Sequence, residues 1–309
     1  MSALAEAEPF VRAPDWTWYI LFYFFLAGLS GGSYAIATLL RLSNRAYEPA
    51  ARVGYYTSFV ALLGCPVLLT LDLGQPLRFW HMLVNTTPGD EGPIFRYWSP
   101  MSVGAWALVV FSVFAGLSFL EVFVKDRRRS NERSAPPGAL VKAFNVVGTV
   151  AGLFIAGYTG VLLAVSNQPV WSDTWALGGL FLASGLSGSA ALIGWLAHYR
   201  RDGEFSLPGL VRSERLFQVL EVLLIAVFVV TLIPTGALSR AFGFPWFVLW
   251  GVAAIGLVAG LFGPGATRNE ITSGGVVAVR RSAGAVVLPA TLVLIGILAL
   301  RAAIIFSAQ

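Results

Sequence analysis

Cysteine and histidine are almost absent from this sequence. Its one cysteine, Cys65, lies inside a hydrophobic run, which leaves no disulfide framework and no cysteine spacing of the iron–sulfur or zinc type. The two histidines, His81 and His198, lie at opposite ends of their predicted helices and cannot ligate one haem as a pair. We therefore expect no metal site, haem or iron–sulfur cluster here, and any electron carrier is expected to be a dissociable ligand or a partner subunit.

Charge is also scarce. Charged residues make up 12% of the chain and hydrophobic residues 57%, with a mean hydropathy of +0.74, more apolar than a soluble domain of 309 residues needs for its core. This composition predicts a polytopic membrane protein in contact with lipid. The excess of 21 Lys and Arg over 16 Asp and Glu is then a signal of membrane orientation, and no nucleic-acid partner is expected.

Long hydrophobic runs divide the chain into membrane spans. After a polar tail over residues 1–16, a run of about 20 apolar residues is long enough to cross the hydrocarbon core of a bilayer. The same criterion predicts an all-α integral membrane protein of eight transmembrane helices, near residues 17–40, 55–71, 101–124, 141–165, 175–198, 215–233, 245–263 and 284–306. We expect one membrane domain, 1–309, with four-helix halves at 17–165 and 166–309.

The positive charges are unevenly divided between the two sides of the membrane. The side reached after the first, third, fifth and seventh helices carries 16 of the 21 Lys and Arg residues. The positive-inside rule makes this side cytoplasmic. Both termini, and the long loop over residues 72–100, are then expected on the outer side of a prokaryotic cell membrane.

A short internal repeat relates the two halves. Residues 25–33 (FLAGLSGGS) in the first predicted helix resemble residues 181–189 (FLASGLSGS) in the fifth, and both helices cross the membrane in the same direction. The repeat is therefore parallel, unlike the inverted repeats of many transporters. Small residues recur four apart in both copies, which predicts close helix packing more than a direct ligand role.

The stretch over residues 71–81 (LDLGQPLRFWH) places Asp72, Arg78 and His81 at the mouth of a hydrophobic helix. A carboxylate at the membrane edge is costly unless it meets water, a partner or a ligand, so it indicates a functional site. The Gly and Pro that follow are equally typical of a simple helix end and turn. The residues alone leave both interpretations open.

Four further polar residues fall within or beside predicted helices. Glu221 lies deep in the sixth helix, where either proton transfer or a structural hydrogen bond to Gln218 would account for it. Glu121 is expected to form an exposed ion pair with Lys125. Arg301 is expected to extend to the interface or approach an outer-face site. Tyr158, flanked by small residues near the outer side, is either an interfacial tyrosine or a donor to a ligand carbonyl.

Three motifs in order resemble the polysulfide reductase NrfD-type membrane subunits. They are residues 71–79 (LDLGQPLRF), residues 99–106 (SPMSVGAW), and residues 158–163 (YTGVLL) followed by residues 169–171 (PVW). The likeness spans most of the chain and includes eight helices, outward termini and a four-plus-four plan. In this family Asp72 and Arg78 match the aspartate and arginine of the loop motif, and Tyr158 matches the tyrosine of the fourth helix.

The resemblance implies a quinone-reactive subunit without a cofactor of its own. Its partners would be a ferredoxin-like iron–sulfur subunit on the outer face and a molybdopterin catalytic subunit, and its ligand a dissociable menaquinone or ubiquinone. We expect Tyr158 to donate to a quinone carbonyl and Asp72 to exchange the proton, tuned by Arg78 or His81.

The first helix departs from the family, because some relatives have a polar pair with a histidine there. Here the first helix offers Tyr23, Ser30 and Ser33 instead, and His81 is a candidate substitute from the loop. The alternative from another class is a transporter with Asp72 and Glu221 as coupling sites. That class would be marked by an inverted repeat and broken helices, for which only Pro66 gives any sign.

Overall fold

The chain folds into a bundle of long helices in the computed structural model, which describes residues 14–44, 47–127, 138–199, 207–263, 270–273, 276–279 and 283–309. The long helices are α1 (Trp18–Ser43), α2 (Glu48–Asp72), α3 (Pro100–Arg127), α5 (Ala139–Ala164), α6 (Leu177–His198), α7 (Leu207–Leu232), α9 (Trp246–Phe262) and α10 (Ala283–Ser307). Short elements connect them: η2 (Pro76–Met82), α8 (Leu238–Phe242) and the strands β1 (Val84–Asn85), β2 (Gly92–Pro93), β3 (Glu270–Ser273) and β4 (Val276–Val279).

Seven of the described helices are long and apolar enough to cross a membrane, which confirms a multi-pass membrane protein. Each of the eight predicted spans overlaps a helix. The span predicted at 245–263 is α9, whose 17 residues fall just short of that length criterion, so an eighth crossing stays a prediction. At 1.5 Å per residue, α9 is about 25 Å long, near the lower limit for a spanning helix.

Two helices begin earlier than hydropathy predicts. The α2 helix starts at Glu48, seven residues before the predicted 55, and α7 starts at Leu207, eight residues before the predicted 215. Charged residues lie in both added segments and lower the local hydropathy, although they do not prevent helix formation. In α2, Pro49 stands in the first turn, where its fixed φ favours a helix start, and Glu48 and Arg52 find ionic partners.

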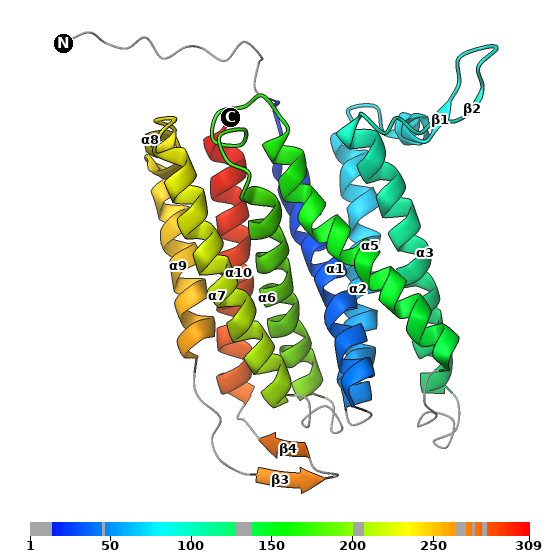
Figure 1. Ribbon diagram of the computed structural model, residues 1–309, viewed down its shortest axis with the longest axis vertical. Coiled ribbons are helices and arrows are strands. Elements are labelled where there is room, and N and C mark those ends of the chain that lie inside the picture. The colour runs from blue at the N-terminus through cyan, green and yellow to red at the C-terminus, as the bar shows by residue number, and fades with distance from the viewer. Residues whose placement is uncertain are drawn as a thin grey trace.

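Two groups of four long helices lie side by side (Figure 1). The first group contains α1, α2, α3 and α5, and the second contains α6, α7, α9 and α10. The two groups meet where α1 and α5 pack against α6. The α1 helix starts and α10 ends at one face of the bundle, which we call the terminal face. The opposite end is called the basic face. Both α1 and α6 run from the terminal face to the basic face.

The packing of α1 against α6 confirms the prediction from the small-residue spacing. A Cβ atom on Gly32 would lie 2.5 Å from the Ser189 hydroxyl and 2.7 Å from the Gly185 carbonyl oxygen, and one on Gly185 would lie 3.0 Å from the Gly28 carbonyl. The Ser189 hydroxyl also donates to the Leu29 carbonyl across the crossing, at 3.0 Å. The two repeated segments therefore pack directly on each other through their backbones.

Connections at the terminal face are long and structured. Between α2 and α3, η2 is followed by the short β1–β2 pair, which projects beyond the bundle (Figure 1). Gly74, with φ +68°, makes the turn after α2 in the left-handed conformation that favours glycine. In the connection to α6, Trp171 is fully buried, donates to the Ile304 carbonyl at 2.7 Å and stacks on Trp16.

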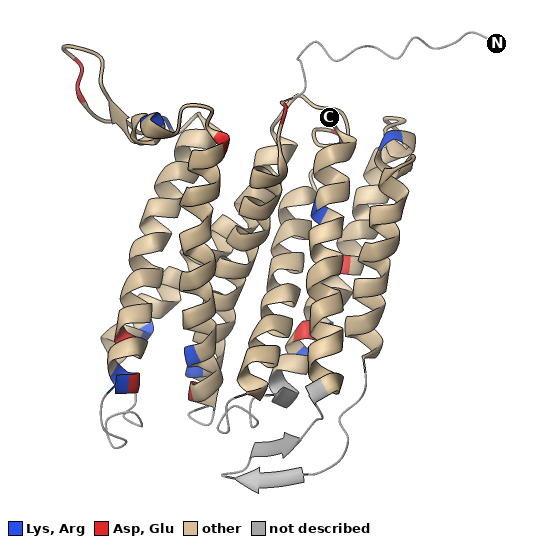
Figure 2. Ribbon diagram, turned by 180° about the vertical axis from the view of Figure 1, so that it is seen from behind, with Lys and Arg blue, Asp and Glu red and all other residues tan. Residues whose placement is uncertain are grey.

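Charged side chains at the basic face pair across helices. Arg41 of α1 contacts Glu48 at 3.0 Å and Glu121 of α3 at 2.7 Å, and Arg52 of α2 contacts Asp126 of α3 at 2.7 Å. Figure 2 shows charged residues gathered at this end of the helices and a few within their length. The expected Glu121–Lys125 pair is present at 2.6 Å. Its description as an exposed pair was wrong, because Glu121 also binds the buried Arg41 and ties α3 to α1.

Candidate functional site

Asp72, Arg78 and His81 lie at the terminal face, as the sequence predicts. Asp72 is the last residue of α2, and its Oδ1 accepts a hydrogen bond of 3.1 Å from the Thr17 hydroxyl, the N-cap residue of α1. Arg78 and His81 are exposed on η2. The His81 ring packs against Trp80, and its Nδ1 lies 3.2 Å from the Thr86 hydroxyl. The carboxylate therefore sits at the start of α1, and the two basic side chains face outward.

Tyr158 lies on α5 two turns from its terminal-face end, and only 7% of it is exposed. Its ring lies over Gly104 of α3, where a Cβ atom would clash with the phenol, and its hydroxyl donates to the Pro100 carbonyl. Gly160, two residues later, lies directly against the Leu177 carbonyl at the start of α6. The glycines in two of the sequence motifs thus allow α3, α5 and α6 to close around this tyrosine.

An apolar groove of about 530 Å³ opens beside Tyr158 at the terminal end of α3, α5 and α6. Its wall is mostly aromatic and aliphatic, and aromatic residues from three segments surround it: Tyr97, Trp98, Phe154, Tyr158 and Trp175. Ligand pockets of roughly 300–1,000 Å³ with apolar walls and few polar groups suit rings with hydrophobic tails. Sequence reasoning missed Tyr97, Trp98 and Trp175, although aromatic residues directly before the motif at 99–106 and at a predicted helix start were a usable signal.

The four predicted site residues do not form one cluster. Within the residues that the structure describes, no hydrogen bond or ion pair joins Tyr158 to Asp72, Arg78 or His81. The groove is lined by Tyr158 and not by the other three. Tyr23 of α1, a polar group that the sequence offers on the first helix, is buried and 4% exposed. The joint role of the four predicted residues in one site therefore stays a prediction.

Glu221 lies near the middle of α7 and is 2% exposed. Its Oε2 accepts a hydrogen bond of 2.9 Å from the Ser187 hydroxyl of α6. The expected partner Gln218 was wrong, because both amide atoms of Gln218 are buried without a hydrogen-bond partner from the protein. Glu221 therefore has a structural hydrogen bond, as one of the two interpretations of the sequence expected, although with a different partner. The other interpretation, proton transfer, is not tested by this contact.

Arg301 does not extend to the membrane interface, so that expectation was wrong. The side chain is 0% exposed and lies where α1, α6 and α10 meet. It donates to the carbonyl of Phe24 on α1, and on α6 to the carbonyl of Phe181 at 2.9 Å and the hydroxyl of Ser184 at 3.1 Å. A Cβ atom on Gly28 would lie 2.5 Å from its guanidinium, so the glycine stripe also makes room for this arginine. Hydropathy could not reveal this, because it treats each helix alone.

The described residues contain no group of three or more His, Cys, Asp or Glu side chains that could hold a metal ion. The chemistry open to the terminal-face site is hydrogen bonding and proton exchange by a phenol and a carboxylate. In the bundle interior, Glu221 adds a carboxylate that is shielded from bulk water.

Comparisons with known proteins agree with the motifs. The sequence is 26% identical to one chain of the polysulfide reductase of Wolinella succinogenes, over 95% of this sequence and 94% of that protein, and 26% identical to protein NrfD of Escherichia coli over 95% of each. It is also 26% identical to one subunit of the selenate reductase of Mesobacillus selenatarsenatis, over 79% of this sequence and 64% of that protein's length. The family described as polysulphide reductase, NrfD matches residues 8–309, and the protein belongs to this family.

Proposed function

We propose that this protein is the quinone-reactive membrane subunit of a multi-subunit oxidoreductase. It would pass electrons between the quinone pool of a prokaryotic cell membrane and an iron–sulfur partner that serves a molybdopterin catalytic subunit. Two relatives are named as one chain of a polysulfide reductase and one subunit of a selenate reductase, which supports a role as one subunit of a reductase. The protein alone would not be catalytic.

The groove beside Tyr158 carries the proposal for the quinone. Its volume of about 530 Å³ and its apolar, aromatic wall fit a quinone ring and the first part of an isoprenoid tail. When bound, a quinone, either menaquinone or ubiquinone, supplies the two-electron, two-proton redox chemistry. The groove adjoins α3, α5 and α6 at the terminal face, where an electron-carrying partner could approach it.

Within this proposal Tyr158 and Asp72 have different tasks. The phenol of Tyr158 donates to Pro100 in the free protein, and it would transfer this hydrogen bond to a ligand carbonyl. Asp72, at the edge of the membrane beside Thr17, would exchange protons with the aqueous side. Arg78 and His81 stay as proposed tuning residues, acting on Asp72 through space rather than by the contacts that the structure shows.

The terminal face is the proposed docking side for the iron–sulfur partner. The connection from α2 to α3 exposes several large apolar side chains on a projecting segment, among them Leu77 (88% exposed), Phe79 and Trp80. Apolar side chains that a folded protein leaves exposed in a group mark an interaction surface. A partner seated here would lie close to both Asp72 and the Tyr158 groove.

Membrane orientation follows from the same proposal. The basic face would be cytoplasmic by the positive-inside rule, and the terminal face, with both ends of the chain, would be outside. With α9 as the eighth crossing, the two groups of four helices would form the parallel-related halves 17–165 and 166–309.

The groove is tested by filling it in the complex purified with its partners. We expect Val161→Trp, which projects a large ring into the groove, to abolish extractable quinone and quinol-linked turnover, and Tyr158→Phe to weaken both. Val150→Trp is the matched control on the same helix, since Val150 is 66% exposed and outside the groove. Unchanged quinone content in Val161→Trp would refute this site.

Two more variants test the remaining parts of the proposal. Asp72→Asn should slow turnover without loss of the complex, whereas Asp90→Asn, on the exposed hairpin, should not. Leu77→Asp should release the iron–sulfur partner during purification. Leu140→Asp is the control, because Leu140 is equally exposed (87%) at the basic face. Purification of the protein without partners or quinone would favour the transporter alternative instead.

A further inference from the structure

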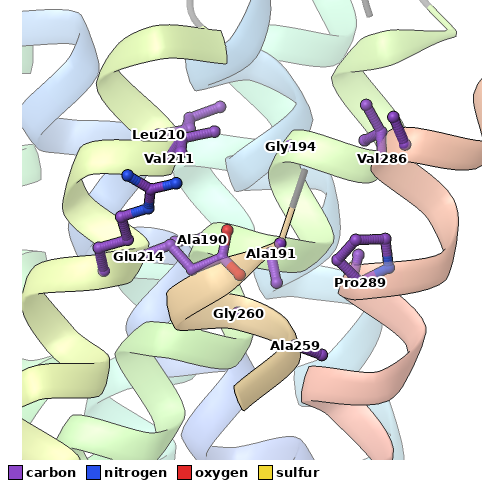
Figure 3. A pocket seen from close by; sticks show the side chains of 14 residues that line it. Ala190, Ala191, Gly194, Leu210, Val211, Glu214, Ala259, Gly260, Val286 and Pro289 are labelled. Atoms are coloured by element: carbon purple, nitrogen blue, oxygen red, sulfur yellow. The ribbon is translucent and has the colours of Figure 1, made fainter. Parts of the chain in front are cut away.

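The groove beside Tyr158 takes part of its wall from a loop segment. Tyr97 and Trp98 lie at the end of the connection from α2 to α3, just before α3 begins, and both line the groove. By contrast, the small cavity of about 40 Å³ between α6, α7, α9 and α10 is lined almost entirely by residues of the helices themselves (Figure 3). The shape of the groove therefore depends on how this one segment is held.

The two aromatic side chains of the segment have little packing to hold them. Tyr97 is 76% exposed and Trp98 is 68% exposed, and their rings meet edge to face with centroids 4.9 Å apart. Side chains that are free to move must be ordered when a ligand binds, and this ordering weakens binding. A wall that is fixed before the ligand arrives would therefore bind it more tightly.

Side chains of α3 fix the backbone of this segment. The indole N–H of Trp106 donates to the Ile94 carbonyl at 2.8 Å, and the Ser102 hydroxyl accepts from the Arg96 N–H at 3.1 Å. Ser102 and Trp106 are four residues apart, so they lie on the same face of the helix. The segment that leads to Tyr97 is thus hydrogen-bonded along one face of the first two turns of α3.

The opposite face of these two turns receives Tyr158. Gly104 lies two residues from both Ser102 and Trp106, which is about 200° around an α-helix. A Cβ atom on Gly104 would collide with the phenol ring, and the Tyr158 hydroxyl donates to the Pro100 carbonyl. The motif at residues 99–106 therefore holds the wall segment on one face and Tyr158 on the other.

The start of a helix does not by itself require both kinds of contact. The Ser99 hydroxyl accepts from the Ser102 N–H at 3.4 Å, which is the usual capping arrangement. The Ser102 hydroxyl and the Trp106 indole bond outside the helix instead, to backbone groups of the segment before it. Capping therefore accounts for Ser99 and leaves the other two side chains without a role.

We propose that Trp106 and Ser102 are positioning residues that hold Tyr97 and Trp98 as a preorganised wall of the ligand groove. The inference rests on the proposed quinone site and gives the motif at residues 99–106 a role in ligand affinity. Neither Trp106 nor Ser102 lines the groove, so both act through the segment. Because the wall binds the ligand and takes no part in the reaction, losing its support should raise KM for the quinol and leave kcat unchanged.

The first test does not involve a quinone. Hydrogen–deuterium exchange of the backbone amides of residues 94–99 is measured in the purified complex. Trp106→Phe, which lacks the indole N–H, and Ser102→Ala should speed this exchange, and Ser102→Thr, which keeps the hydroxyl, should restore it. Trp250→Phe is the matched control, because it loses an indole bond of 3.0 Å to the Ala241 carbonyl, away from the groove.

The second test measures affinity in the same complex, with menaquinol-1 and ubiquinol-1 as probes. Trp106→Phe should raise Kd and KM by about two- to tenfold, the usual effect of one hydrogen bond, with kcat unchanged. The double variant Tyr97→Ala/Trp98→Ala has no aromatic wall on this side. Adding Trp106→Phe to it should therefore have no further effect on affinity.

Exchange at the wild-type rate in Trp106→Phe, or faster exchange with unchanged quinol affinity, would overturn the proposal. A further loss of affinity when Trp106→Phe is added to the double variant would overturn it too, since Trp106 would then act by another route. Val161→Trp separates these results from failure of the quinone site. If Val161→Trp retained its quinone, the groove would not be the site and the wall would have no role in affinity, whereas the exchange of residues 94–99 would be unaffected.

Discussion

The two groups of helices hold their charged residues in different ways. At the basic face of the first group, six side chains pair across α1, α2 and α3: Arg41, Glu48, Arg52, Glu121, Lys125 and Asp126. Each has an opposite charge within 4 Å, and all but Lys125 and Asp126 have two. In the second group, Glu221 and Arg301 lie deep in the bundle, and the described contacts include no direct ion pair between them. Glu221 binds the Ser187 hydroxyl instead, and Arg301 binds the Ser184 hydroxyl.

We propose that this difference separates charges that anchor helices from a carboxyl group that takes part in proton transfer. Paired charges at a membrane edge offset part of each other's desolvation cost and connect neighbouring helices. The Glu221 carboxylate has one hydroxyl partner and, among the described residues, no cation in direct contact, so its charged form is costly inside the membrane. Such an environment suits a group that gains and loses a proton. Several polar residues inside the first group are also paired, as in Tyr34 with Ser118 at 2.7 Å and Thr38 with Tyr55 at 3.0 Å, whereas the buried Ser33 hydroxyl has no partner.

The largest effect is expected from removing Arg301. Arg301→Ala would take away the links from α10 to α1 and α6, leave a void at the crossing and remove a positive charge near Glu221. Breaking a buried charged network of this kind costs about 3–5 kcal/mol in the free energy of unfolding. Unfolding in detergent measures this cost. Arg240→Ala is the control: Arg240 is an exposed arginine at the terminal face, makes one contact to Ser307, and its removal should change stability by less than about 0.5 kcal/mol. Equal losses in both variants would mean that Arg301 does not join the two groups.

A smaller loss should follow when the α1–α6 crossing is widened. Gly32→Ala would place a Cβ atom 2.7 Å from the backbone oxygen of Gly185, so the helices must separate, at a cost of about 1–3 kcal/mol. Gly251→Ala on α9 meets nothing within 4 Å and should be neutral or stabilising by up to about 1 kcal/mol, because alanine is the better helix former. Gly32→Ala should therefore lower the melting temperature, whereas Gly251→Ala should leave it unchanged or raise it. A neutral Gly32→Ala would contradict the close backbone contact.

Sequence reasoning predicted what depends on a single helix or a local pattern. The membrane class and the position of each long helix followed from hydropathy. Close packing at the two small-residue segments followed from their spacing, although the spacing did not predict that α1 and α6 would be each other's partners. Helix starts at Glu48 and Leu207 were missed, because the charges that lower hydropathy there do not prevent helix formation.

Contacts between distant helices could not be predicted in the same way. Two of the three hydrogen-bond partners of Arg301 are backbone carbonyls 120 and 277 residues away, and backbone oxygens carry no sequence signal. The hydrogen bond of Glu221 goes to a serine on another helix, not to Gln218 on its own. At the terminal face the motifs identified Tyr158, but the aromatic wall of its groove depends on how α3, α5 and α6 meet.

The smallest effect is expected at the basic face, where the charges share partners. Glu121→Gln leaves Arg41 bound to Glu48 at 3.0 Å, so the free energy of unfolding should fall by only about 1 kcal/mol. Lys125→Gln, which removes a partly buried partner one turn away on the same helix, should cost about 0.5 kcal/mol or less. Salt screens charges near the surface far more than buried ones. Raising the salt concentration should therefore shrink the loss in Glu121→Gln and leave that of Arg301→Ala unchanged. The contrast between the two groups does not hold if Glu121→Gln costs as much as Arg301→Ala, or if neither loss responds to salt. Either result would mean that the basic-face cluster depends on each member as strongly as the bundle interior depends on Arg301.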